Sequence, residues 1–337
     1  MATISCHHAR SALGSLTIHG IDTAETLEAA GINPKLISLP MARISDQQMT
    51  LLVQTIWQRL DDEFMGFTPH KCERGAFAYM VYSIRRCETL REALTMGMRF
   101  YGLLSKDIDT QLVEQNECAS IVIKFADPSL DPDYFYLEFW MIIWHRLASW
   151  LCGVKIPLQS TQLIHPTGIS DEHKSELQFM FPGKLLLDQA VNQMEFSRQF
   201  LNRPIIRTKT EVQTFLQHSP AQLLTIPGDD KSFQNKISRY LHSMATQPLS
   251  FPDIHSLARQ YNMSVQTLHR RLKQEGTSYQ RIKDNLRRDL ALNKLIQERL
   301  PVHQVAEIVG FSEARSFTRA FKHWTGLSPR EYCKFLK

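Results

Sequence analysis

The sequence predicts an α+β domain followed by an all-helical domain in which two helix-turn-helix units are joined by a long helix. Three observations predict it. The first 230 residues mix helical and alternating apolar patterns, the rest are helical with proline punctuation, and a basic pattern occurs twice near the C-terminus. We place the domains at 1–230 and 231–337, with a linker rich in Pro, Gly and Asp around 227–232.

Local signals place the first elements of the N-terminal domain. Ser45 and Gln48 form a capping box before a run of apolar residues at helical spacing. Thr89 and Glu92 form another, and its helix is predicted to run to about Leu104. The β-branched run 119–125 predicts a strand. Further strands are expected near 160–165, 176–181 and 184–188.

An aromatic run between Tyr134 and Cys152 resembles a membrane segment in length. It contains Glu138, His145 and Arg146, and charged groups at a bilayer centre are costly. We therefore interpret it as a buried helix of a soluble domain.

The same helix supplies weak candidates for an effector pocket. Trp140 and Trp144 would line it, with Glu138, His145 or Arg146 orienting a polar group. For any single aromatic side chain, core packing is the favoured interpretation. Pairing among Glu138, His145 and Arg146 is a further alternative.

The six cysteines are scattered without a C-x-x-C pair, which argues against a disulfide framework or a structural zinc site. Cys6, His7 and His8 offer metal-binding groups, but three adjacent residues near a chain end are expected to be unstructured. We therefore assign no metal, no cofactor and no catalytic residue. With no recognisable signal peptide, a cytoplasmic location is expected.

Charge is distributed unevenly along the chain. Residues 251–337 hold 16 Lys and Arg against 8 Asp and Glu, whereas the first 250 residues hold 23 against 26. The C-terminal quarter is therefore the part suited to bind a polyanion.

A pattern of apolar-x-Arg-x-apolar-Lys begins at Leu268 and recurs 49 residues later at Phe317. Each copy is followed by a glycine and then a serine. Ser264 and Ser312 are the expected N-caps of the two helices that carry the copies. The predicted helix-turn-helix units cover about 253–275 and 302–324, with a connecting helix at roughly 279–299.

Helical periodicity assigns an outward face to each copy, because the apolar positions must face the core. These faces carry side chains that hydrogen-bond base edges and phosphates. They comprise Gln266, His269, Arg270 and Lys273 in the first copy, and Arg315, Ser316, Arg319 and Lys322 in the second. One such helix is typical of a solvated surface. Two copies with a local excess of positive charge indicate that this part of the chain binds double-stranded DNA.

These motifs resemble the AraC/XylS transcription regulators. The first unit matches at Leu257-Ala258, Met263-Ser264, Leu268, Arg270 and Gly276. The second matches at Gly310-Phe311, Phe317, Arg319, Phe321-Lys322, Gly326, Ser328-Pro329 and Tyr332. The resemblance implies base contacts from Gln266, His269 and Arg270 and from Arg315, Ser316 and Arg319.

The N-terminal domain is similar to the effector domain of the branch that includes ornithine-utilisation and virulence regulators. The matches lie around Gly66, at Gly75-Ala76-Phe77, from Cys87 to Leu94, and at 200–204. This resemblance implies a homodimeric, effector-controlled regulator, in our interpretation an activator, with RNA polymerase as a partner. The effector itself stays unknown.

Two rival functions remain open at this stage. One is a DNA-binding regulator without a small-molecule effector, controlled by a protein partner or by abundance. The other is an enzyme fused to a DNA-binding module. The chain contains no Gly-rich phosphate loop, H-E-x-x-H motif or nucleophile elbow, so we do not expect an enzyme.

Overall fold

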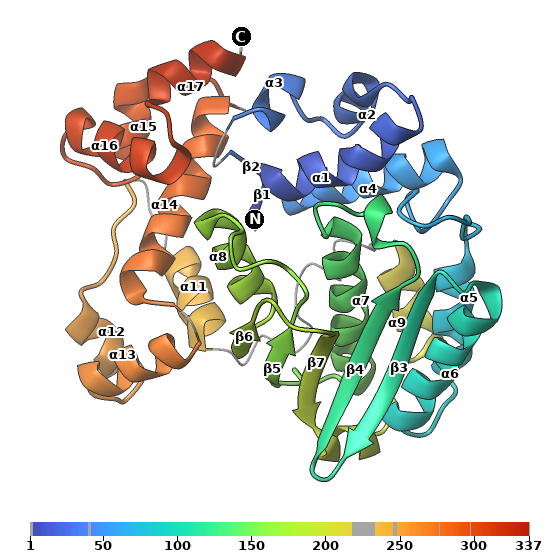
Figure 1. The fold of residues 1–337 in the computed structure, drawn as a ribbon. Helices are drawn as coiled ribbons and strands as arrows, with labels where there is room; N and C mark the ends of the chain where they lie inside the picture. The colour runs from blue at the N-terminus through green and yellow to red at the C-terminus, as the bar shows by residue number, and fades with distance from the viewer. Residues whose placement is uncertain are drawn as a thin grey trace. The chain divides into compact units, whose positions relative to one another are not determined.

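The computed structural model describes residues 3–39, 42–217, 233–244, 248–275, 277–296 and 298–336 (Figure 1). The chain divides into two compact units. The first comprises His7–Ile32 and Asp46–Asp229, and the second comprises Met1–Cys6, Asn33–Ser45 and Asp230–Lys337. The predicted linker around 227–232 lies outside the described residues.

The first unit is built on a mixed sheet of five strands within its described residues. The strands are β3 (Ile108–Gln115), β4 (Cys118–Phe125), β5 (Leu158–Gln162), β6 (Lys184–Leu186) and β7 (Asn192–Ser197). Their order is β3-β4-β7-β5-β6, with β5 and β6 parallel and the other pairs antiparallel. In β7, buried and half-buried residues alternate, as expected when one face of the sheet packs against the core.

Helices pack on this sheet and around its ends (Figure 1). They are α1 (Cys6–Ile18), α2 (Thr23–Ala29), α4 (Asp46–Leu60), α5 (Ala76–Ile84), α6 (Leu90–Leu104), α7 (Phe135–Cys152), α8 (Asp171–Met180) and α9 (Lys209–Gln217), with short 3₁₀ turns at Pro128–Leu130 and Arg198–Asn202. The predicted start of α6 is confirmed, because the Thr89 side chain accepts a hydrogen bond from the Glu92 amide.

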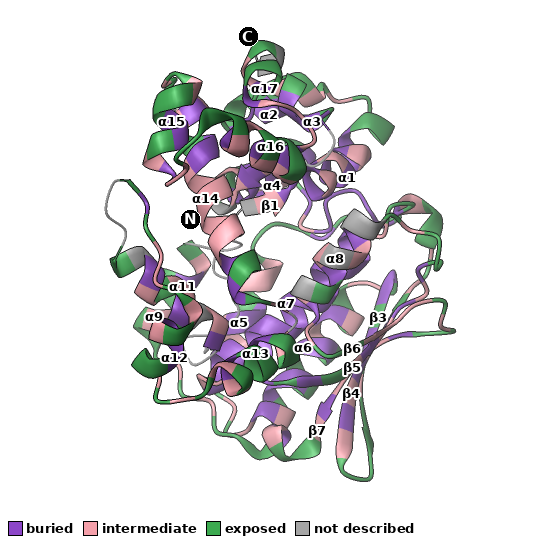
Figure 2. Ribbon diagram, turned by 90° about the vertical axis from the view of Figure 1, so that its left-hand side faces the viewer, coloured by how far each residue is buried: buried purple, intermediate pink, exposed green. Residues whose placement is uncertain are grey.

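Helix α7 is the central core element of this unit (Figure 2). All 18 of its residues are buried, which confirms the interpretation of the aromatic run as a buried helix. Gly153 ends the helix in the left-handed conformation, at φ 65°, which glycine adopts without steric cost. No helix among the described residues is long and apolar enough to cross a membrane.

Two expectations for this unit were wrong, and strand β7 was missed. Residues 176–180 belong to helix α8, and Phe181 is its C-cap. Leu177 and Phe181, four residues apart, are both buried. The Cys6-His7-His8 segment is not unstructured but begins α1, with His8 buried. Strand β7 was not predicted at all, although it pairs with both β4 and β5.

Within its described residues, the second unit is helical apart from one small sheet. Its helices are α3 (Pro34–Ile37), α11 (Phe233–Ser243), α12 (Ile254–Gln260), α13 (Val265–Gln274), α14 (Tyr279–Ile296), α15 (Val302–Ile308), α16 (Ala314–Thr325) and α17 (Pro329–Leu336). The sheet pairs β1 (Thr3–Ser5) with β2 (Arg43–Ser45). N-terminal segments therefore belong to the same unit as the C-terminal helices.

The two helix-turn-helix units and their connecting helix are present as predicted, with one difference at a cap. Ser264 is the N-cap of α13 and accepts a hydrogen bond from the Thr267 amide. The N-cap of α16 is Glu313, not Ser312, and its side chain makes no capping hydrogen bond. Gly326 ends α16 at φ 80°. Gly276, the equivalent glycine of the first copy, lies outside the described residues.

Candidate functional site

Helix α13 is amphipathic, with one apolar face and one polar face. Leu268 and Leu272 are fully buried in a core formed by α11, α12, α13 and the start of α14. The four predicted DNA-contacting side chains lie on the opposite, exposed face, and they are Gln266, His269, Arg270 and Lys273. The helical spacing of the apolar positions thus sets which side chains reach solvent.

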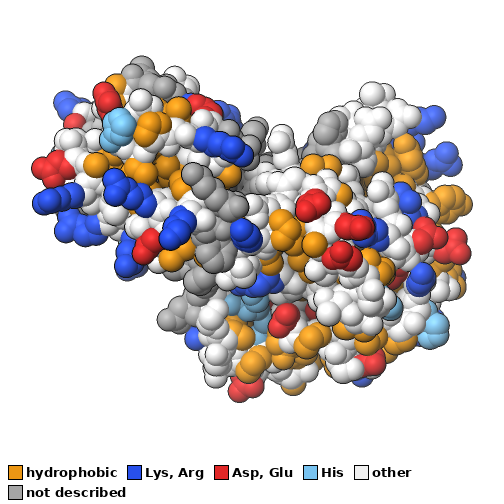
Figure 3. All heavy atoms as spheres, turned by 90° about the horizontal axis from the view of Figure 1, so that it is seen from above, with side chains coloured by type: hydrophobic (Ala, Val, Ile, Leu, Met, Phe, Trp, Pro, Cys, Tyr) orange, Lys and Arg blue, Asp and Glu red, His pale blue; other side chains and the backbone are white. Residues whose placement is uncertain are grey.

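Helix α16 repeats this arrangement. Phe317 and Phe321 are fully buried and their rings contact each other. The predicted side chains Arg315, Arg319 and Lys322 are exposed, and Ser316 is half-buried. Lys and Arg side chains gather at the left of Figure 3, where Figure 1 places the helices of the second unit.

Among the described residues, no hydrogen bond or ion pair joins the side chains of the eight predicted DNA-contacting residues to another residue. Neighbouring charged residues do have structural contacts. Arg271 lies over the Phe233 ring, and Glu275 accepts the Phe233 and Gln234 amides at the start of α11. The outward faces therefore keep their donors available for an anionic partner.

Arg287 connects the second helix-turn-helix to α14. Its guanidinium lies 5.0 Å from the centre of the Phe251 ring and 5.1 Å from that of Phe311. Its Nε donates to the Val309 carbonyl at 3.2 Å. Burial lowers the pKa of the guanidinium from its usual value. Arg287 therefore holds the turn of the second helix-turn-helix against α14, the helix between the two recognition helices.

The effector candidates lie in the core of the first unit. An aromatic cavity of about 20 Å³ is lined by Trp57, Glu63, Phe64, Phe77, Tyr101, Tyr136, Phe139, Trp140 and Ile143. Of the candidates, Trp140 lines it and donates its indole N–H to Thr110 at 2.9 Å. Glu138, Trp144 and His145 are buried elsewhere on α7. This volume suffices for a water molecule and not for a metabolite.

Glu138 and His145 do not pair with each other. Glu138 Oε1 accepts from His165 Nε2 at 2.8 Å and from His173 Nε2 at 2.6 Å. Burial raises the pKa of Glu138 to about 7, and the hydrogen bond from His165 opposes that rise. His145 Nε2 lies 2.8 Å from the Ile156 carbonyl, and burial lowers its pKa to about 4.

The sequence analysis did not identify two features of this core. Glu63, whose pKa is raised by burial, lines the aromatic cavity, and its carboxylate accepts the Gly75 and Phe77 amides. His165 and His173 meet Glu138 although they lie 27 and 35 residues away in the chain. No short spacing motif links these residues, so only the tertiary fold brings them together.

Two family profiles match the chain. Residues 20–205 match the arabinose-binding domain found at the N-terminus of the AraC transcription regulator, and residues 257–334 match a helix-turn-helix domain. The second match includes both recognition helices.

Similar proteins match along most of the chain. The ornithine utilization regulator of Pseudomonas aeruginosa is 24% identical over 329 residues, covering 96% of this chain and 94% of that protein. An uncharacterized HTH-type transcriptional regulator of Mycobacterium tuberculosis is 25% identical over 327 residues, covering 94% and 92%. The crystal structure of the transcriptional regulator CdpR from Pseudomonas aeruginosa is 20% identical, with a TM-score of 0.32, over 97% of this chain and 98% of that one.

Proposed function

Because the chain belongs to the family of AraC transcription regulators with an N-terminal arabinose-binding domain, we propose that α13 and α16 bind neighbouring major grooves on one face of double-stranded DNA. The observation that carries this proposal is the pair of exposed basic faces, each backed by fully buried apolar side chains. Groove spacing of about 34 Å per turn requires two such faces held at a fixed separation, and α14 is the helix that joins them in the chain.

The predicted side chains have distinct roles in this proposal. Arg270, Arg315 and Arg319 read guanine, and Gln266 reads adenine, through bidentate hydrogen bonds. Lys273 and Lys322 neutralise phosphates, while His269 and Ser316 add polar contacts. Binding of short duplexes of randomised sequence, followed by sequencing of the retained pool, tests this. Two conserved half-sites about one turn apart support it, whereas enrichment without a motif contradicts it.

We further propose that a small molecule controls DNA binding from the aromatic cavity. Of the described residues that line the cavity, Glu63 is the one with a carboxylate, and it lies among rings that attract cations. An amine therefore suits the cavity once its side chains rearrange. The name of the Pseudomonas aeruginosa relative makes ornithine the first amine to test. Operator affinity is measured at fixed salt with and without it, and with putrescine and lysine.

The small cavity also favours a second candidate function. A cavity of about 20 Å³ suits a regulator that has no small-molecule effector and responds to a protein partner or to its own abundance. Unchanged operator affinity with every amine supports this alternative. A shift of at least severalfold with one amine contradicts it.

The remaining parts of the proposal follow from the family. We infer that the protein is a cytoplasmic homodimer that activates transcription through RNA polymerase and is not an enzyme. The relatives reported above are transcriptional regulators, which supports this inference. Transcription in vitro with RNA polymerase, an operator template and the purified protein measures the sign of regulation directly.

A further inference from the structure

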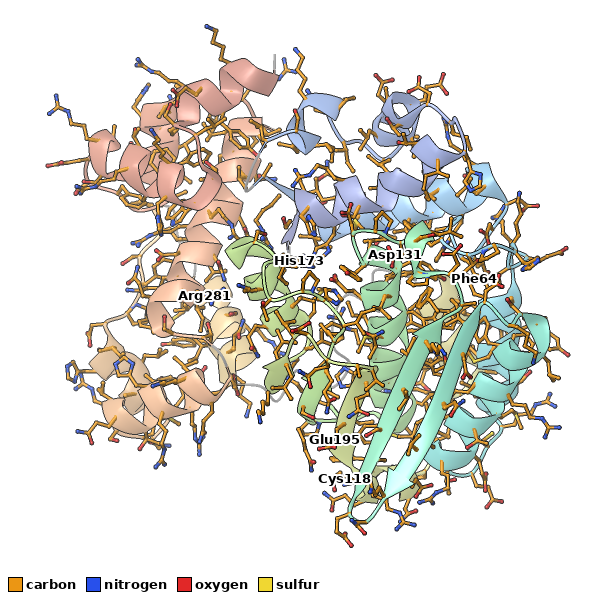
Figure 4. The ribbon with its side chains drawn as sticks, in the orientation of Figure 1. Phe64, Cys118, Asp131, His173, Glu195 and Arg281 are labelled. Carbon is orange, nitrogen blue, oxygen red and sulfur yellow. The ribbon has the colours of Figure 1, made fainter. Side chains whose placement is uncertain are left out.

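A buried cluster of imidazole and carboxylate groups lies in the first unit, apart from the aromatic cavity. Glu138 comes from α7, His165 from the segment after β5, and His173 from the first turn of α8. One potential ligand atom from each lies within 4.8 Å of the others. Figure 4 shows His173 at the N-terminal end of α8 and Asp131 close to the start of α7.

The cluster is closed to solvent. The side chains of Glu138, His165 and His173 are 3%, 0% and 6% exposed. Two histidines of α1 adjoin it. His8 Nδ1 lies 3.8 Å from Glu138 Oε2, and the His7 ring centre lies 4.4 Å from that of His173. Three histidines therefore lie against Glu138, and His7 packs against the ring of His173; the four histidines come from three separate segments of the chain.

Two further carboxylates lie on the segment just before α7. Asp131 is 4% exposed, its Oδ2 accepts the Leu137 amide at 2.9 Å, and its Oδ1 has no hydrogen-bond partner among the described residues. Asp133 Oδ2 accepts a hydrogen bond from Ser11 of α1 at 3.3 Å. A buried group of carboxylates is costly when ionised, and a divalent cation removes that cost.

We propose that Glu138, His165 and His173 bind one divalent transition-metal ion of the zinc type, with His8 as the fourth ligand. Two imidazoles and a carboxylate form a donor set that zinc uses in proteins. Because the cluster is buried, the ion serves to stabilise or regulate the unit and not to activate water for catalysis.

The present distances describe the hydrogen-bonded form of this site. Tetrahedral zinc with ligand bonds of about 2.0–2.1 Å separates neighbouring ligand atoms by about 3.3 Å. The two Nε2 atoms lie 2.8 and 2.6 Å from Oε1, so the pairs must open by roughly 0.5 and 0.7 Å, which small side-chain rotations achieve.

Binding also requires a free lone pair on each Nε2. His165 Nδ1 has no hydrogen-bond partner among the described residues, and it can carry the ring proton when Nε2 binds the ion. The neutral ring thereby changes tautomer without a net loss of a proton. A ring that begins protonated releases one proton to solvent.

The proposal is tested on the full chain, stripped of metal with a chelator. Zn²⁺ is titrated in competition with a chromophoric chelator, and one ion per chain is expected. Glu138→Gln and His173→Gln should each weaken binding about 100-fold or more, since even residues that only support a ligand cost 10–100-fold. His303→Gln, which changes an exposed histidine of α15, is the matched control and should leave the affinity unchanged.

X-ray absorption of the wild-type zinc complex gives an answer that does not depend on variants folding. A shell of nitrogen and oxygen atoms with imidazole scattering supports the proposal. A sulfur atom in the shell, or the absence of stoichiometric binding, overturns it. Equal affinity of the wild type and both site variants also overturns it. None of these measurements involves DNA, so their outcome is independent of the proposed regulatory function.

Discussion

Gly310 lies directly against the carbonyl oxygen of Leu249, and a Cβ atom built at Gly310 would overlap that oxygen. Gly310 has φ +80°, a conformation that other L-residues rarely adopt. The contact continues in the backbone, where the Leu249 amide donates to the Ile308 carbonyl at 2.8 Å. The turn of the second helix-turn-helix is therefore fixed by the segment that precedes the first one.

Gly310→Ala should destabilise the second unit by roughly 2–4 kcal/mol, because it combines backbone strain with a clash against main chain that cannot move aside. Chemical denaturation of the full chain measures this. Gly102→Ala is the control, since Gly102 lies in α6 with open space around it and the change should be neutral or slightly stabilising. Equal midpoints for the two variants would contradict the clash.

Arg319→Ala should cost roughly 1–3 kcal/mol at the cognate operator and relax base preference at one position. Lys322→Ala should instead weaken binding to all sequences and lower the salt slope by about one. Fluorescence anisotropy over a range of salt concentrations separates the two effects. Arg330→Ala, an exposed arginine of α17 outside the predicted faces, should change neither quantity. If Arg319→Ala and Lys322→Ala behaved alike, the assignment of roles on α16 would be wrong.

Arg287→Ala should reduce affinity for a two-site operator more than for a single half-site. The variant loses the contacts to both the Phe251 and Phe311 rings and the hydrogen bond to Val309, so the second helix-turn-helix is held less firmly on α14. Arg287→Lys keeps the charge but not the planar group, and should be intermediate. Equal losses on the two kinds of DNA would show that the residue acts only through general electrostatics.

His145 should make the first unit sensitive to acid. Burial lowers its pKa from 6.5 to about 4, with smaller contributions from Arg146 and Lys155. Its stabilising contribution is therefore complete above pH 6.5 and is lost as the pH falls toward 4, amounting to roughly 3 kcal/mol. The raised pKa values of Glu138 and Asp131 act in the opposite direction, because their contribution is lost as the pH rises.

A variant isolates the effect of His145 from that of these carboxyl groups. His145→Gln retains a donor for the Ile156 carbonyl but cannot take up a proton. As the pH falls from 6.5 to 4, the wild type should therefore lose unfolding free energy relative to His145→Gln. Its stability advantage over the variant should shrink or reverse. A difference that stays constant over this range would show that His145 does not titrate there.

Elements with local signals could be predicted from the sequence, and elements defined by distant partners could not. Thr89 and Ser264 mark helix starts through their own side chains, and the repeat beginning at Leu268 and Phe317 defines both recognition helices. The segment 176–181 was misread because a short run of apolar residues fits a strand as well as a helix. Strand β7 is specified by its neighbours β4 and β5.

The candidate sites divide in the same way. The outward faces of α13 and α16 follow from helical periodicity alone, so their exposure could be anticipated. The partners of Glu138 could not be anticipated, because His165 and His173 reach it only through the packing of α8 and the segment after β5 against α7. The small size of the aromatic cavity likewise depends on how the rings fill space.

The second unit includes Met1–Cys6 and Asn33–Ser45 from the start of the chain, so it is formed by segments that are not continuous in sequence. Relatives could exchange DNA-binding modules if their genes were joined at one point near residue 230. Such a junction would separate β1, β2 and α3 from the C-terminal helices of the same unit. A chimera made this way would combine one parent's C-terminal helices with the other parent's N-terminal segments. Successful recombination should therefore favour parents whose first 45 residues are already compatible with the incoming helices.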